Sequence, residues 1–275
     1  MADTPTLPNF RRPPVSEVAL AVHFEPLTSL QSVHLGLLWS RWRDRFPRVQ
    51  ELANRPPIPD ELVPPPVARD LHIELVDEQP VPLVWFVSDD GEHVVQVQND
   101  RLVHNWRKAA EHTVYPRYRE LRPRLEDELR LFDDFLEDEK LGQLTPVQCE
   151  ITYLNPVGLA KHPATLPPIE RVVAPWSGRY TDDFLPPPEE TMVSSRYRIV
   201  HEDQMCGSLY IRARPYWRQG DDATVLMLEL VARGRPFGQG IEGAFTFLDL
   251  AHQWIVQGFV SFTTSEMHQA WERET

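Results

Sequence analysis

The sequence has 275 residues, of which 41% are hydrophobic, and it includes eight Trp and twelve Phe. This content predicts a packed core and excludes global disorder. Acidic residues outnumber basic ones by 41 to 28, which gives a formal net charge of −13. A net field of this sign disfavours non-specific binding to DNA or to anionic membranes, although it permits a local basic patch.

Cys149 and Cys206 are the only cysteines, so we expect reduced core thiols rather than a disulfide scaffold. The first residues, MADTPTLPNFRRPP, lack the apolar run of a signal peptide. Nowhere does an apolar stretch reach the roughly 18–20 residues of a membrane span. These features predict a cytoplasmic protein.

The first half begins with a Pro-rich arm at residues 1–14. Alternating apolar residues predict a strand over residues 17–25. Thr28 and Gln31 fit a capping box, which predicts that a helix follows and runs to Pro47.

A Pro-rich stretch at residues 55–67 is typical of a stiff connector. We expect strands at 71–76, 82–88, 93–98 and 101–105, with a hairpin at Asp90-Gly91. Helical spacing of apolar residues predicts a long helix over 115–140. It has Pro116 in its first turn, a kink or second start at Pro123, and Gly142 as the C-terminal cap.

The second half opens with a predicted strand at 147–155, followed by a Pro-rich excursion to about residue 191. Three more strands are expected at 194–201, 208–216 and 224–233. We place their turns at Cys206-Gly207 and Gly220-Asp221, because glycine tolerates the backbone angles of a turn. An apolar helix over 240–261 and a short last helix, capped by Thr263 with Glu266, complete the chain.

Each half is thus a run of strands closed by a long helix. This order predicts an α+β fold with predominantly antiparallel sheet and long helices packed on one face. After the arm at 1–14, the halves span 15–142 and 143–275, and their element order suggests a duplicated unit. The sequence leaves open whether they form one continuous domain or two.

Five stretches, spread in order over most of the chain, resemble a sporadically distributed bacterial family of about this length with no assigned activity. They are PPVSEVALAVHFEPL, QVQNDRLVHNWRK, YPRYREL, QCEITYLNPV and FTTSEMHQAWER. The resemblance implies a self-contained protein passed between bacteria. It supplies no catalytic residues.

The first candidate site is the polar segment between residues 96 and 108. Buried amides and an arginine fork can recognise a carboxylate or a peptide backbone. The alternative is a polar hairpin that satisfies its own backbone groups. The candidate residues are Gln98, Asn99, Asp100, Arg101, Asn105, Trp106 and Arg107.

Glu150 and Tyr153 are candidates on the strand at 147–155, where the two-residue period places them on opposite faces. A buried Glu150 needs a raised pKa or a cationic partner, for which Arg101 or Arg107 is available. A cleft between a curved sheet and a long helix is a natural ligand site, and we expect Glu150, Arg101 and Tyr153 at its mouth.

Tyr210, Arg212 and Arg214 share one face of the predicted strand at 208–216. Interleaved Tyr and Arg can stack bases and pair phosphates, or form a protein-binding hot spot. The plainer alternative is a solvated outer face. The acidic net charge favours an acidic protein partner or self-association over nucleic acid.

We find no motif for a metal, a phosphate-binding loop, a dinucleotide or a nucleophilic serine, so no cofactor is predicted. The function we expect is that of a non-enzymatic binding or accessory protein, by analogy one from a mobile-element or defence-type locus. The alternatives are a small-molecule-binding or enzymatic protein with a cleft between sheet and helix, and nucleic-acid binding through the Tyr/Arg face.

Overall fold

The computed structural model describes residues 7–56, 81–158, 168–182, 184–218 and 223–274. Its main element is a nine-stranded antiparallel sheet, in the order β3-β4-β5-β6-β2-β7-β10-β9-β8. The α+β class with antiparallel sheet is therefore confirmed. Within the described residues no helix is long and apolar enough to cross a membrane.

The nine strands are β2 (Glu17–Phe24), β3 (Arg48–Leu52), β4 (Leu83–Val87), β5 (His93–Gln98), β6 (Arg101–Arg107), β7 (Pro146–Val157), β8 (Val193–His201), β9 (Gln204–Arg218) and β10 (Ala223–Gly234). A two-stranded sheet joins β1 (Asn9–Phe10) to β11 (Arg273–Glu274). The helices are α1 (Ser32–Trp42), α2 (Tyr118–Asp138), α3 (Ile169–Val172), α4 (Gly240–Phe262) and α5 (Ser265–Ala270).

Apart from the additional edge strand β3, the two halves of the chain have the same strand order, and they meet at the pair β2–β7. In each half the first strand is central, the last strand lies beside it, and the earlier ones follow outward: β2, β6, β5, β4 and β7, β10, β9, β8. Leu20 pairs with Ile151 at the junction, and both side chains are fully buried. One sheet therefore spans both halves, while a division into folding domains stays a prediction.

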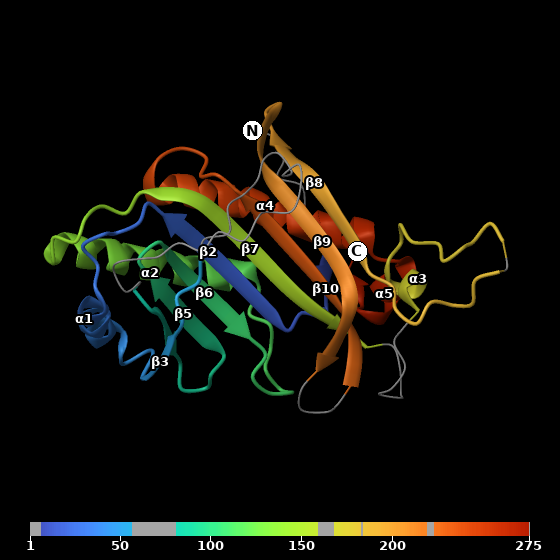
Figure 1. Cartoon of the computed structure of the whole chain (residues 1–275), viewed down its shortest axis with the longest axis horizontal. Helices are drawn as coiled ribbons and strands as arrows, with labels where there is room; N and C mark the ends of the chain where they lie inside the picture. Colours follow the sequence, from blue (N-terminus) through green and yellow to red (C-terminus); the bar gives the residue numbers. More distant parts are fainter. Residues whose placement is uncertain (1–6, 57–80, 159–167, 183, 219–222, 275) are drawn as a thin grey trace.

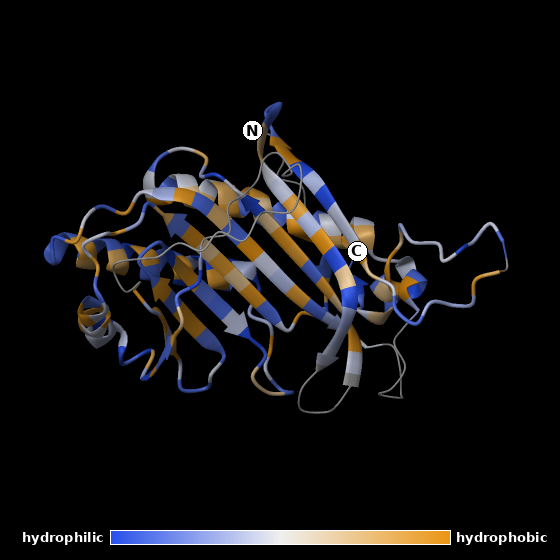
Figure 2. Cartoon of the chain, in the orientation of Figure 1, coloured by the Kyte–Doolittle hydropathy of each residue, from blue (hydrophilic) through white to orange (hydrophobic). Residues whose placement is uncertain are grey.

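The helices α2 and α4 follow the last strand of each half and lie side by side on one face of the sheet (Figure 1). The two-residue period of the strands gives the sheet one apolar face, and the apolar stripes of the helices pack against that face. Phe132 of α2 packs on Phe24 of β2 with ring centroids 5.7 Å apart. Figure 2 shows the corresponding alternation of polar and apolar residues along the strands.

The turn between β8 and β9 lies at Glu202 and Asp203, whose φ angles are 49° and 61°, and not at Cys206-Gly207 as predicted. Gly207 instead lies inside β9, where an added Cβ would approach the carbonyl oxygen of Arg233 to 2.3 Å. The glycine thus serves a close approach of two backbones rather than a turn.

Two helix N-caps also differ from the prediction. The N-cap of α1 is Gln31, whose backbone N–H donates to His34 Nδ1 at 2.9 Å, and not Thr28. The N-cap of α5 is Thr264, which accepts from Met267 N, whereas Thr263 donates to the Phe259 carbonyl oxygen. In each case a polar neighbour in the same short run provides the cap.

The remaining differences concern prolines, glycines and one strand. Helix α2 begins at Tyr118, so Pro116 lies before the N-cap Arg117 rather than in the first turn. The helix continues past Pro123 without a second start, and its C-cap is Glu139 rather than Gly142. The exposed edge strand β3 carries no two-residue burial pattern, so the sequence did not predict it. The predicted strand at 71–76, the turn at Gly220-Asp221 and most of the connector at 55–67 lie outside the described residues.

Candidate functional site

Strand register gathers many of the candidate side chains on the sheet face that the long helices leave uncovered. His23 pairs with Arg101 on one side and with Gln148 on the other. Glu150 pairs with Arg233 across β7 and β10. Because the chain alternates faces, polar groups from β6, β2, β7 and β10 form one row on the sheet face opposite α2 and α4. This face of the sheet is turned toward the viewer in Figure 1.

Glu150 forms an ion pair with Arg233, whose Nε lies 2.5 Å from Glu150 Oε2. Thr152 Oγ1 donates a second hydrogen bond to the same carboxylate at 3.0 Å. The predicted partners, Arg101 and Arg107, bind elsewhere. The carboxylate is thus compensated by a cross-strand neighbour that is distant in sequence.

The Tyr210 ring lies among three guanidinium groups. The Cζ atoms of Arg196, Arg212 and Arg233 are 5.4, 5.7 and 5.9 Å from its centroid. Such cation–π contacts hold the arginines beside the ring, and two of the arginines also have carboxylate partners, Glu150 for Arg233 and Glu229 for Arg212.

The same arrangement continues toward the end of β9. The Arg214 guanidinium lies 5.9 Å from the Tyr216 ring centroid. Arg212 also reaches Glu229 at 3.3 Å, but its side chain remains 47% exposed. Tyr216 is 40% exposed. This end of the face therefore presents both cationic and aromatic surface to solvent.

The turn at 96–108 binds the protein's own backbone. Arg101 forms two hydrogen bonds with the Asp100 carboxylate, at 2.8 and 2.9 Å, and a third with the carbonyl oxygen of Arg55 at 2.9 Å. Gln98 accepts from the Arg55 N–H and donates to its carbonyl oxygen, both at 3.0 Å. The carbonyl oxygen of Asn99 accepts from Leu27 N. These buried groups recognise a peptide backbone, as their chemistry predicts, but it is an internal one.

The other candidates of this segment and of β7 are separated by the sheet. Asn105 donates to Glu17 and Arg107 donates to the Gly91 carbonyl oxygen, each at 2.8 Å. Trp106 and Tyr153 point to the opposite, helix-covered face. The expected cleft mouth with Glu150, Arg101 and Tyr153 together is therefore wrong, since Tyr153 lies on the other side of the sheet from the two charged residues.

A buried cluster that the sequence reasoning missed joins Glu128 of α2 to two histidines. His104 Nδ1 lies 2.8 Å from Glu128 Oε2, and its Nε2 lies 3.1 Å from His93 Nδ1. Arg45 pairs with the other carboxylate oxygen at 3.2 Å. Burial lowers the pKa of His93 to about 4, so this ring is neutral near pH 7. Glu128 falls within the apolar stripe of its helix, which was the available signal.

A second missed feature is a cavity of about 370 Å³ between the helices, the sheet and the N-terminal arm. Tyr153 lines it, and its hydroxyl lies 2.8 Å from that of Tyr115 and 3.3 Å from His252 Nδ1. The ring of Tyr118 stacks on His252 with centroids 4.1 Å apart. These tyrosines come from α2, from β7 and from the loop before α2, and they lie together only because of the tertiary structure.

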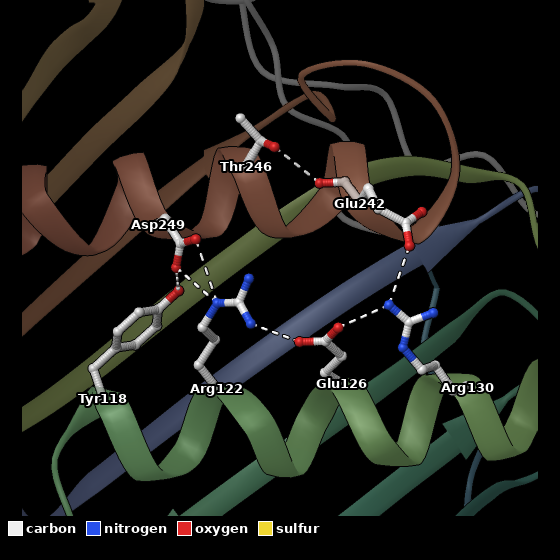
Figure 3. Close-up of polar contacts among 7 residues, drawn as sticks. All are labelled: Tyr118, Arg122, Glu126, Arg130, Glu242, Thr246 and Asp249. Atoms are coloured by element: carbon white, nitrogen blue, oxygen red, sulfur yellow. Dashed lines mark hydrogen bonds and ion pairs between the residues drawn. The ribbon is translucent and has the colours of Figure 1, made fainter. Parts of the chain in front are cut away.

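Polar side chains hold α2 against α4 beside this cavity (Figure 3). Tyr118 donates to Asp249 at 2.7 Å, and Arg122 bridges Asp249 and Glu126. Arg130 links Glu126 to Glu242 further along. These contacts are partly exposed, so they fix the relative position of the helices more than they stabilise the fold.

The described residues offer little for metal or thiol chemistry. Their His, Cys, Asp and Glu side chains contain no group of three or more that could hold a metal ion. Burial raises the pKa of both Cys149 and Cys206, which keeps them as thiols near pH 7.

In comparisons with known proteins, no family model matches the chain and no curated protein matches it. The resemblance to a sporadically distributed bacterial family accordingly stays a prediction.

Proposed function

We propose that the chain is a non-enzymatic binding protein that recognises an acidic protein partner through the Tyr/Arg face, defined as Arg196, Tyr210, Arg212, Arg214 and Tyr216. The main observation that supports this proposal is the group of three guanidinium groups around the Tyr210 ring. Tyr and Arg are the residues that most often dominate protein interfaces, because each combines apolar area with directed polar groups.

The charge distribution supports an acidic partner. The whole chain carries −13, whereas the Tyr/Arg face contributes three arginines, of which Arg212 is paired with Glu229. Such a contrast steers an acidic surface to one region and repels it elsewhere. Nucleic acid also has acidic groups and flat bases, but its longer polyanionic surface meets the repulsion of the whole chain.

The test compares the wild type with a variant carrying Arg212→Glu and Arg214→Glu. A matched control, Arg43→Glu with Lys108→Glu, reverses the same amount of charge at exposed positions elsewhere. Immobilised proteins are incubated with a lysate of the source organism, and bound proteins are identified at low and high salt. We expect an acidic protein to be retained by wild type and control, lost from the Tyr/Arg variant, and released by salt.

Equal recovery on all three proteins would contradict the proposal. A labelled single-stranded oligonucleotide is measured in parallel. If the oligonucleotide binds the wild type and the control but not the Tyr/Arg variant, while no lysate protein shows this pattern, nucleic-acid binding replaces the acidic protein partner as the proposed function.

Self-association is a second candidate, favoured by the edge of the sheet. Among the described strands β8 pairs only with β9, and its Tyr197 and Val200 are 40% and 44% exposed. An exposed edge strand is a template for pairing with another copy. Light scattering during gel filtration checks this: a dimer in the wild type that becomes a monomer in Val200→Lys supports it, and a wild-type monomer contradicts it.

A further inference from the structure

The N-terminal arm forms one wall of the cavity beside Tyr153. Phe10 of β1 packs edge-on against Phe259 of α4 and Trp271, with centroids 5.5 and 6.2 Å apart. Arg117 donates to the Phe10 carbonyl oxygen at 2.7 Å and to Asn9 Oδ1 at 2.9 Å. The pairing of β1 with β11 holds the arm from the other side. A few contacts at the chain end therefore form this wall of the cavity, which is partly open to solvent.

The interior of the cavity is apolar and uncharged. Leu230, Ile255 and Val256 line it together with the aromatic rings. Burial raises the pKa of Tyr153, so its hydroxyl keeps its proton. Burial lowers the pKa of His252 to about 4, so its ring is neutral near pH 7. Its size falls at the lower end of ligand pockets, and a few converging polar groups in an apolar wall are typical of such sites.

The charged residues that line the cavity are basic. Among the described residues that line the cavity, Arg117 and Arg119 are basic and none is acidic. This is unexpected in a chain with 41 acidic and 28 basic residues. Arg119 Nε lies 3.9 Å from Glu120 Oε1, but the Arg119 side chain retains 85% of its accessible surface, so its guanidinium can still meet an incoming anion.

We propose that this cavity binds a small aryl or alkyl carboxylate. The apolar body lies between α4 and the helix-side face of β7 and β10, and the carboxylate lies toward Arg117 and Arg119. The Tyr115–Tyr153–His252 chain supplies the hydrogen bonds available deeper in the cavity. An ammonium group is rejected, because it would meet two guanidiniums and a neutral interior. This site is on the opposite side of the sheet from the Tyr/Arg face.

The test uses three probes that differ only in the head group: phenylpropionate, phenylpropanol and phenylpropylamine. Binding to the full chain is measured by titration calorimetry at low salt and about pH 7.5. We expect the acid to bind at least about tenfold more tightly than the amine, with the alcohol between them. Val256→Trp fills the cavity and should abolish binding, whereas Gln257→Trp, at the next and exposed position, should not. Thermal unfolding checks that both variants fold.

Arg119→Glu provides a second measurement on a variant whose fold is not at risk. We expect this variant to bind the acid at least roughly fivefold more weakly than the wild type and to bind the alcohol with unchanged affinity. The proposal is overturned if none of the probes binds, if the three bind equally, or if the acid still binds to folded Val256→Trp. If Val256→Trp does not fold, an acid affinity unchanged in Arg119→Glu overturns it.

Discussion

Replacing His252 by Phe should make the protein less sensitive to mild acid. His252 stacks on Tyr118, and its Nδ1 lies 3.3 Å from the Tyr153 hydroxyl. Burial lowers its pKa from 6.5 to about 4, against a smaller opposing effect of Asp249. Phenylalanine keeps the flat ring and removes the titration.

The sign and size follow from the two pKa values. Between pH 6.5 and about 4 the unfolded chain binds a proton at this position and the folded chain does not. Stability is therefore fully retained above pH 6.5 and falls as the pH drops below it. From pH 7.5 to 5.5, where most carboxylates remain ionised, His252 should account for a loss of about 1.3 kcal/mol.

Urea unfolding at these two pH values measures the effect as a difference between proteins. His252→Phe should lose about 1.3 kcal/mol less than the wild type on acidification, whatever its stability at pH 7.5. Ile255→Val is the control, because it trims a buried methyl from the same helix without adding or removing a titrating group. If His252→Phe and the wild type lose the same stability, the histidine is not held neutral by burial and the reasoning is refuted.

Two further predictions concern the core. Glu128→Ala should lower the free energy of unfolding by about 3 kcal/mol, because it removes a buried carboxylate from His104. The control Glu120→Ala, on the exposed side of α2, should change the free energy of unfolding by no more than about 0.5 kcal/mol. Equal effects of the two variants in urea unfolding would contradict the buried cluster. Gly207→Ala should cost at least about 2 kcal/mol, since its Cβ meets a β10 carbonyl, while Gly36→Ala in α1 has open space and should gain about 0.5–1 kcal/mol. Thermal and urea unfolding check both, and a neutral Gly207→Ala would mean that the strands can separate there.

Local patterns in the chain were sufficient for most of the elements. The alternation over 17–25 and 147–155 and the apolar stripes over 115–140 and 240–261 predicted strands and helices close to their observed positions. Opposite orientations of Glu150 and Tyr153 also followed from the two-residue period. These properties depend on neighbours in sequence, which is why a pattern can reveal them.

Partners across the sheet depended on strand order, which no local pattern encodes. Glu150 pairs with Arg233, 83 residues away, because β7 lies beside β10 rather than beside β6. The symmetric arrangement around β2 and β7 likewise brings Arg196 and Arg233 to one tyrosine ring. The position of Gly207 opposite a β10 carbonyl also depends on strand order, since it reflects contact between the backbones of two neighbouring strands.

The order of strands in the sheet thus decided which residues meet in the candidate sites. The sequence alone determined which face of each strand or helix is apolar and which is polar. The cavity shows the division most clearly: its tyrosines, its histidine and the arm at its wall come from four separate parts of the chain. Each part has an ordinary local pattern. Only the packing of α2 and α4 on one face of the sheet, with the arm beside them, forms the cavity between these parts.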